Sequence, residues 1–412
     1  MSGFRSPLDA YREDLSRAHA QMRLAAGDEF WVILATGLRR LAQAPLRSRR
    51  AGAHRLANAL AAFDESASHD RDNGRPAAVA EALAQFPDPA FASVLVTHVR
   101  GAVADAEEAG ALLLAREMLT DLRALSAHAP AVDRGLILIQ LGRIARTLGD
   151  LDVARDLLSA AGDIGRASGT RELEIRVAAS QAVLARTRGN HPVARELFHT
   201  AAEGAADLGL VDISGLAHHG LMVEMAEVGD FDAALRHGWH ALSAARTQGA
   251  REAEMLINLA QLCADAGYDT AALGGFHAAL ARTSAPRLRL PALAGTAGAA
   301  ARLRDATRLG IAERAIAAEA SDAFPFETAR AWLALARAKR AFGDVAAGDL
   351  AAEKAAIIAH AHGFYEITHH VEHDAQPKPV PLSNTGLNVV KSLETWSDDP
   401  SVDLALSSAP TG

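Results

Sequence analysis

The sequence has 412 residues, of which 50% are hydrophobic and only 5% are aromatic, and its formal net charge is −8. This charge gives no support to general nucleic-acid binding, and the single cysteine, Cys263, excludes an internal disulfide framework. No apolar run is long enough to cross a membrane, and the first residues lack a signal-peptide core, so we expect a cytoplasmic protein. The composition favours closely packed helices over a β-sandwich.

The N-terminal part predicts three helices, over about residues 8–26, 28–43 and 47–64, followed by a polar loop over residues 64–76. We interpret residues 1–75 as a helical cap. The cap contains the densest basic cluster of the chain, which is either a solvated helix end or a patch for an acidic partner or a phosphate backbone. The cluster consists of Arg39, Arg40, Arg47, Arg49, Arg50 and Arg55.

Residues 133–161 contain two amphipathic helices joined at Gly149-Asp150. The glycine is suited to the left-handed end of the first helix, and the aspartate is suited to the N-cap of the second. Similar junctions recur about forty residues apart, which predicts a helical array. They occur at Gly110, Gly189-Asn190, Gly229-Asp230, Gly267-Tyr268 and Gly343-Asp344, with a copy that lacks glycine near Arg304-Asp305.

The repeat resembles a tetratricopeptide repeat over roughly residues 97–365. The matching positions, in order and spacing, are Leu138, Leu141, Gly142, Gly149, Ala154, Leu158 and Ala161, and Trp332 falls at the tryptophan position of the family's first helix. The family period is about 34 residues, so this longer repeat is similar to those of bacterial regulators. The resemblance implies an all-α, right-handed superhelix of six or seven helical hairpins over residues 76–373, with a tail over residues 374–412.

The resemblance also implies that first-helix residues outside the packing positions line an inner surface. By spacing, these residues are Arg100, Arg143, Arg146, Arg176, Arg186, His219, Gln261, Arg337 and Arg340, together with Leu136 and Ile139. Arginines on successive helices can hold carboxylates or phosphates through forked hydrogen bonds. They are alternatively ordinary surface residues of an arginine-rich chain. On the first interpretation the partner is a protein or peptide of acidic character.

The tail contains Pro377, Pro379 and Pro381, which predict an extended segment, and then an amphipathic helix over residues 383–396 capped by Ser383 or Asn384. Three acidic residues follow, at Asp398, Asp399 and Asp403. Residues 383–403 therefore either dock into the arginine-lined groove of their own chain or form a flexible tail or a packed terminal cap.

A histidine-rich segment is the remaining candidate for chemistry. It comprises His360, His362, His369, His370 and His373, with Glu366 and Asp374. A di-iron bundle needs two Glu-x-x-His motifs, and only Glu366 to His369 fits, so we expect neither a metal nor a cofactor. Nucleophile elbows and phosphate-binding loops are absent from the sequence.

The main hypothesis is a non-catalytic protein-binding or peptide-binding scaffold. The alternatives are a bacterial signal sensor for a small molecule or short peptide, and a helical metal protein or enzyme built on the histidines.

Overall fold

The computed structural model describes residues 27–66, 75–86, 89–108, 111–246, 250–322, 324–364, 367 and 380–396. Within these ranges every regular element is a helix, so the predicted all-α fold is confirmed. The expected helix over residues 8–26 lies outside the described residues. The helices are α2 (Gly27–Gln43), α3 (Leu46–Ser66), α4 (Arg75–Ala84), α5 (Pro89–Glu108), α6 (Leu112–Leu125), α7 (Ala131–Thr147), α8 (Leu151–Ser168), α9 (Arg171–Thr187), α10 (His191–Leu208), α11 (Val211–Glu227), α12 (Phe231–Ala245), α13 (Ala250–Asp265), α14 (Asp269–Leu280), α15 (Pro286–Arg302), α16 (Ala306–Glu319), α17 (Pro325–Phe342), α18 (Val345–His362) and α20 (Asn384–Glu394).

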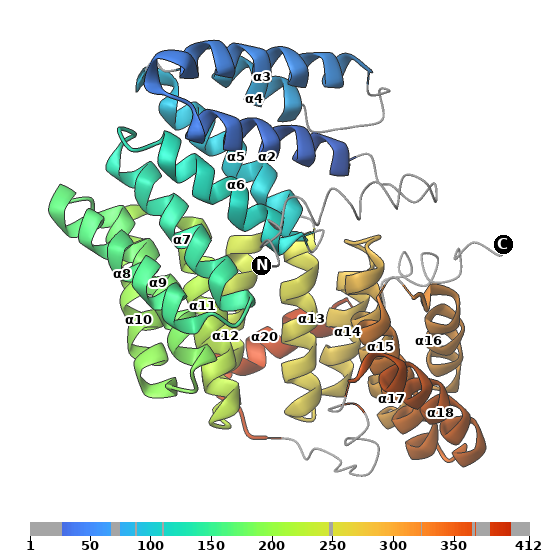
Figure 1. Cartoon of the computed structure of the whole chain (residues 1–412). Helices are drawn as coiled ribbons and strands as arrows, with labels where there is room; N and C mark the ends of the chain where they lie inside the picture. The colour runs from blue at the N-terminus through green and yellow to red at the C-terminus, as the bar shows by residue number, and fades with distance from the viewer. Residues whose placement is uncertain are drawn as a thin grey trace. The chain divides into compact units, whose positions relative to one another are not determined.

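Seven consecutive helix pairs run from α5/α6 to α17/α18 in the described part of the chain (Figure 1), in agreement with the predicted six or seven hairpins. The fold divides into two compact units, residues 1–200 and 201–412, and the division falls within α10. In unit 1 the first helices α5, α7 and α9 contact one another in sequence, and in unit 2 α13, α15 and α17 do the same. We call the side formed by these helices, with α11 in unit 2, the first-helix surface of each unit.

Five of the predicted junctions have a glycine in the left-handed conformation, namely Gly149, Gly189, Gly229, Gly267 and Gly343, whereas Gly110 lies outside the described residues. Gly149 has φ +86°, and the backbone N–H of Asp150 closes the turn on the carbonyl of Ala145 at 2.8 Å. This six-to-one bond satisfies a carbonyl that the helix end leaves without a partner. The predicted side-chain cap by Asp150 is wrong, because its carboxylate lies 3.7 Å from the guanidinium of Arg116 instead.

The degenerate junction keeps the same geometry without glycine. Arg304 has φ +59°, a conformation that costs about 1–2 kcal/mol for a residue with a Cβ atom. Its guanidinium donates to the carbonyls of Ala341 and Phe342, both at 3.1 Å, at the end of α17. Because those carbonyls have no partner within their own helix, the long side chain supplies a contact that glycine lacks. Asp305 then caps α16 by accepting from the N–H of Arg308.

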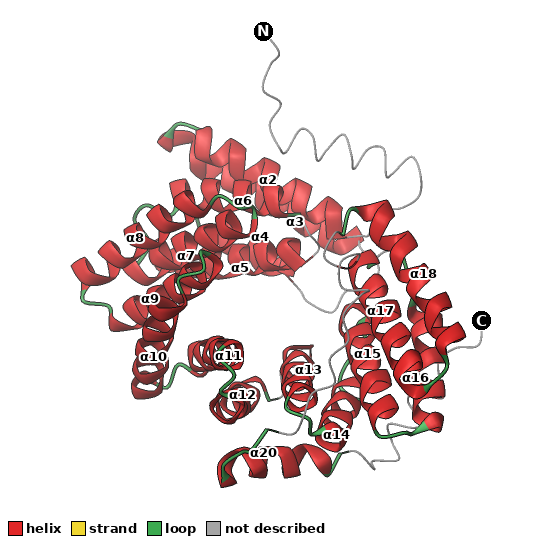
Figure 2. Cartoon of the chain, turned by 90° about the horizontal axis from the view of Figure 1, so that it is seen from below, coloured by secondary structure: helices red, strands yellow, loops and turns green. Residues whose placement is uncertain are grey.

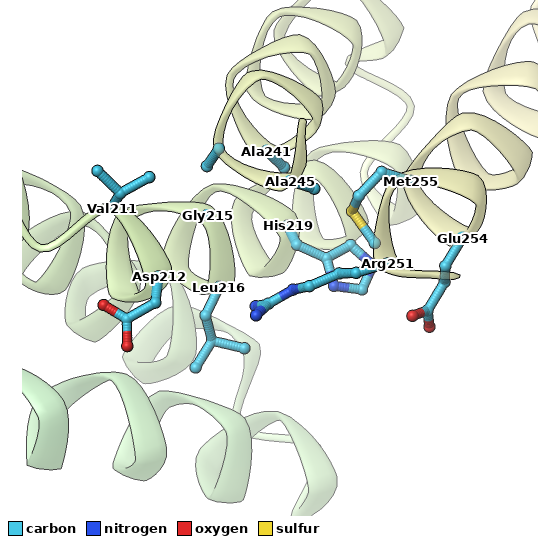
Figure 3. A pocket seen from close by; sticks show the side chains of 11 residues that line it. Val211, Asp212, Gly215, Leu216, His219, Ala241, Ala245, Arg251, Glu254 and Met255 are labelled. Atoms are coloured by element: carbon cyan, nitrogen blue, oxygen red, sulfur yellow. The ribbon is translucent and has the colours of Figure 1, made fainter. Parts of the chain in front are cut away.

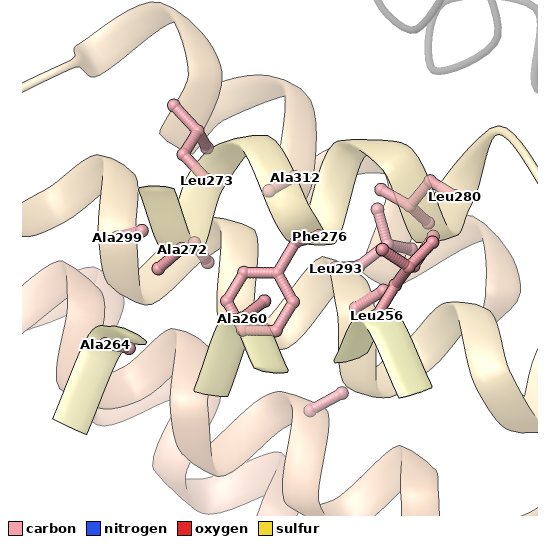
Figure 4. Packing of buried hydrophobic residues seen from close by; sticks show 14 of the residues in the cluster. Leu256, Ala260, Ala264, Ala272, Leu273, Phe276, Leu280, Leu293, Ala299 and Ala312 are labelled. Atoms are coloured by element: carbon pink, nitrogen blue, oxygen red, sulfur yellow. The ribbon is translucent and has the colours of Figure 1, made fainter. Parts of the chain in front are cut away.

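Small residues allow the helix pairs to pack closely around a few large side chains. In unit 2 the fully buried Phe276 lies among Leu256, Ala260 and Leu293 (Figure 4). A methyl group at Gly295 on α15 would overlap the ring of Phe276, so this position needs glycine. Cys263 is also buried, and burial raises the pKa of its thiol to about 12, which makes it an inert core residue.

The repeat length is visible in side-chain contacts between neighbouring first helices. Ser93 on α5 donates to Asp133 on α7, and Arg100 on α5 donates to Gln140 on α7 at 3.1 Å; each pair is 40 residues apart. In unit 2, Asn258 on α13 and His219 on α11 are 39 residues apart, with Nδ2 and Nε2 separated by 3.2 Å. Equivalent positions of successive repeats therefore meet on the first-helix surface, which is where a ligand site can be assembled.

Candidate functional site

The five predicted arginines of unit 1 lie together on its first-helix surface. Arg100 is on α5, Arg143 and Arg146 are on α7, and Arg176 and Arg186 are on α9. Except for Arg143, which is exposed, they are half-buried. The five side chains that the repeat spacing selected in this half of the chain therefore lie on adjacent first helices.

One side of this arginine group is organised by Gln140 and Glu107, which the sequence analysis did not identify. Gln140 Nε2 donates to the backbone carbonyl of Arg100 at 3.3 Å and to Glu107 Oε1 at 2.9 Å. The same Glu107 oxygen accepts from Arg143 Nη2 at 2.7 Å. Because one carboxylate oxygen takes both donors, Glu107 holds Arg143 beside the side chain of Arg100. Only the forty-residue spacing of Arg100 and Gln140 could have indicated this network.

The arginines outnumber the acidic residues around them. Glu107 pairs with Arg143, Glu172 pairs with Arg176 at 2.8 Å, and the charge of Asp133 acts on Arg100. Burial, together with the charges of Arg143 and Arg176, lowers the pKa of Arg100. Arg100, Arg143 and Arg176 therefore each have an acidic neighbour.

Arg146 and Arg186 have no such neighbour among the described residues. They lie one repeat apart on α7 and α9, and neither forms an ion pair with a described residue; Arg186 instead lies 5.9 Å from the ring centroid of Phe198. Burial lowers the pKa of Arg146, and so do the nearby charges of Arg186 and Arg143. A half-buried cation beside other cations is unfavourable unless an anion offsets it. The arrangement is therefore chemically suited to a bound carboxylate or phosphate.

In unit 2 the predicted His219 and Gln261 line pockets between α11 and α13. One pocket of about 190 Å³ is formed by α11, α12 and α13 and is lined by Asp212, Leu216, His219, Arg251 and Glu254, among others. Figure 3 shows Arg251 extending from α13 towards Leu216, with the imidazole of His219 beside it. A second pocket, of about 340 Å³, shares His219 and continues along α11 and α13 to Gln261.

The second pocket is acidic where the arginine group of unit 1 is basic. Gln261 Nε2 donates to Asp265 Oδ1 at 2.8 Å, and Glu227 also lines the wall. Burial raises the pKa of Asp265, against the hydrogen bond from Gln261 and the charge of Arg302. Met222, Val223 and Leu262 supply an apolar lining. The second pocket of unit 2 therefore differs in charge from the arginine group of unit 1.

The last two predicted arginines are on α17. Arg337 is half-buried, whereas Arg340 pairs with Asp349 of α18 at 2.7 Å and lies over the backbone of Gly348. Arg340 therefore lies within its own helix pair, which differs from the expected position on an inner surface. The reason is Gly348, whose missing side chain lets the arginine stem lie against α18.

The tail helix α20 packs onto helices of its own unit, which is the arrangement expected of a packed terminal cap. It packs against α12 and α14, the second helices of two adjacent pairs (Figure 2), through Val389, Val390 and Leu393. Asp232 Oδ1 accepts from the backbone N–H of Ser383 at 2.9 Å and from its hydroxyl at 2.6 Å. The acidic residues that follow it, Asp398, Asp399 and Asp403, lie outside the described residues.

Three histidines of α11 and α12 form a cluster within unit 2. The Nδ1 atoms of His218 and His237 are 3.0 Å apart, and the ring of His240 stacks on His218 with centroids separated by 4.8 Å. No metal-binding group of three or more acidic, histidine or cysteine side chains occurs among the described residues. Of the segment proposed as a metal alternative, His360 and His362 end α18, and its other members lie outside the described residues.

Comparisons with known proteins test the fold. No family model and no curated protein matches the sequence. A signal-transduction ATPase with a tetratricopeptide-repeat sensor, from Pyrococcus horikoshii, is similar in structure, with a TM-score of 0.55, 13% identity and coverage of 80% of this chain. This chain spans 55% of the length of that protein.

The fold is a tetratricopeptide-like helical repeat.

The apo form of RapI is also similar, with a TM-score of 0.49, 9% identity, and coverage of 80% of this chain and 98% of that one. These identities are too low to carry a ligand or an activity to this helical repeat. Within the described residues, none of the helices is both long and apolar enough to cross a bilayer.

Proposed function

We propose that the chain is a non-catalytic scaffold of a bacterial cytoplasm, and that the first-helix surface of unit 1 holds an anionic segment of a protein or peptide. The observation that carries the proposal is the pair Arg146 and Arg186, half-buried side by side with no carboxylate partner among the described residues. Guanidinium groups bind carboxylates through paired, charge-assisted hydrogen bonds. A ligand that supplies two negative charges would offset the charges of Arg146 and Arg186.

Titration of the chain against a fluorescein-labelled peptide of alternating glutamate and glycine, followed by fluorescence anisotropy, tests the proposal. The variant Arg143→Glu/Arg186→Glu should lose binding, because it replaces two positive charges by two negative ones. Arg155→Glu is the matched control, since Arg155 is exposed on α8 and pairs with Asp156 at 3.0 Å. Equal affinities for the wild type and the double variant would contradict the proposal.

A second candidate function is a sensor for a small molecule or short peptide. The pockets that meet at His219 favour it, because a ligand held by α11 and α13 would tie two adjacent helix pairs together. The Pyrococcus horikoshii protein is described as having a tetratricopeptide-repeat sensor, which makes this class of function worth testing. X-ray scattering with and without a metabolite extract should then show compaction, whereas a scaffold should keep its dimensions until a large partner binds.

A further inference from the structure

Two of the six arginines in the basic cluster of the N-terminal helices have structural roles. Arg39 on α2 pairs with Glu117 at 2.8 Å and with Asp121 at 3.2 Å, which joins α2 to α6. Arg49 on α3 donates to the backbone carbonyls of Ala42 and Ala44, at 3.1 and 3.2 Å, and so completes the end of α2. Both arginines therefore stabilise the packing of the N-terminal helices.

The other four arginines of the cluster are exposed. Arg40, Arg47, Arg50 and Arg55 form no ion pair with a described residue. Arg40 and Arg55 differ from the other two because they line one pocket between α2 and α3, with a volume of about 390 Å³. Two guanidinium groups therefore lie at the edge of a pocket. A helix end that is only solvated needs no such pocket.

The hollow has an apolar floor that results from two glycines. A methyl group at Gly37 would overlap the side chain of Leu56, and one at Gly52 would come within 2.7 Å of Leu41. Because both side chains are missing, each leucine lies against the backbone of the opposite helix. Val32 and Ile33 extend the apolar lining along α2 and are both half-buried.

We propose that this groove between α2 and α3 binds an amphipathic helix of a partner protein, with acidic side chains that meet Arg40 and Arg55 and apolar side chains that cover the floor. Charge complementarity favours an acidic partner, and the shape favours a helix, since the ridge of a third helix packs between two antiparallel ones. The groove runs along α2 from Val32 to Ala44. At 1.5 Å per residue this is about 18 Å, which suits a partner helix of roughly 12 residues. This surface is separate from the arginines of α5, α7 and α9.

The experiment uses the full chain and a fluorescein-labelled synthetic helix that carries leucines along one stripe and glutamates on both sides of it. Anisotropy should show saturable binding that weakens with added salt, because exposed charge pairs are screened. The double variant Arg40→Glu/Arg55→Glu should weaken binding at least tenfold. Arg50→Glu is the matched control: it reverses an exposed arginine of the same helix, α3, that does not line the groove, and its affinity should stay within threefold of the wild type.

The outcomes separate this proposal from the others. Loss of binding in Arg40→Glu/Arg55→Glu, with Arg143→Glu/Arg186→Glu unaffected, supports the groove. Loss in Arg143→Glu/Arg186→Glu alone assigns the probe to the first-helix surface of unit 1 and overturns the groove proposal. Equal loss in Arg50→Glu shows general attraction to basic charge and also overturns it. A further outcome is that the wild type binds no peptide but dimerises in sedimentation experiments, and that Arg40→Glu/Arg55→Glu abolishes the dimer. This outcome would identify a second copy of the chain as the occupant and overturn the proposal.

Discussion

The clearest consequence of the arginine group is that Arg146→Met should make the protein more stable while it weakens binding of an anionic ligand. Arg146 is half-buried on α7, burial and the charges of Arg186 and Arg143 lower its pKa, and no described carboxylate pairs with it. Methionine keeps most of the apolar stem of the side chain and removes the charge. The variant therefore loses little packing and relieves both the desolvation and the repulsion.

The size of the effect follows from the partial burial. Replacing fully buried ion pairs by apolar side chains of similar volume stabilises proteins by about 1–4 kcal/mol, and the remaining solvent contact of Arg146 places it at or below the lower end of that range. We expect a gain of about 0.5–1 kcal/mol. For a folding unit of this size, such a gain raises Tm by roughly 1–4 °C.

Thermal unfolding followed by circular dichroism measures this gain. Raising the salt from about 0.1 M to 1 M shortens the screening length from about 10 Å to 3 Å, so it should stabilise the wild type more than Arg146→Met. Arg155→Met is the control, because Arg155 is exposed and hydrogen-bonded to Asp156, which raises its pKa. A lower Tm for Arg146→Met at both salt concentrations would refute the reasoning, because it would mean that the guanidinium has favourable partners.

Three further changes test the fold and its second unit. Asp265→Asn should be more stable than the wild type at pH 7, because burial raises the pKa of Asp265 and the folded state loses stability as the carboxylate ionises. Urea unfolding measures this difference, which should vanish below about pH 4, where the acid is protonated in the folded and unfolded states. Phe276→Ala should cost about 3–5 kcal/mol in the same assay, and Phe276→Leu clearly less, since the ring is fully buried. Asp232→Ala removes the acceptor of two Ser383 hydrogen bonds, so hydrogen exchange should speed up in α20 while the amides of α15 stay protected.

Local chemistry made the repeat predictable. A glycine in the left-handed conformation followed by a helix start is a requirement of a few consecutive residues, so Gly149, Gly189 and Gly229 mark their turns without knowledge of the rest of the chain. Even the degenerate copy at Arg304 keeps this geometry. The aspartates of two junctions, Asp230 and Asp344, cap their helices through their side chains. Asp150 does not, because its carboxylate lies near Arg116 on α6, and that difference depends on packing.

The positions of the site residues could be predicted only where they depend on the repeat spacing. Positions one period apart meet on neighbouring first helices. Arg146 and Arg186 are 40 residues apart in the sequence and therefore lie close together in the structure. Arg340 follows the same spacing but lies against α18, because Gly348 on the facing helix leaves room for it. The contacts of α20 with α12 and α14 could not be predicted, since a tail beyond the repeats has no fixed register with them.

The division of roles between the two helices of each pair explains why charge collects where it does. Second helices such as α12 and α14 take up contacts on both sides, and α20 covers part of their remaining surface. First-helix positions such as those of Arg100 and His219 carry polar side chains that contact the neighbouring first helix. In unit 1 the half-buried charges of Arg146 and Arg186 should cost stability, and on the proposed function a bound anion would offset that cost.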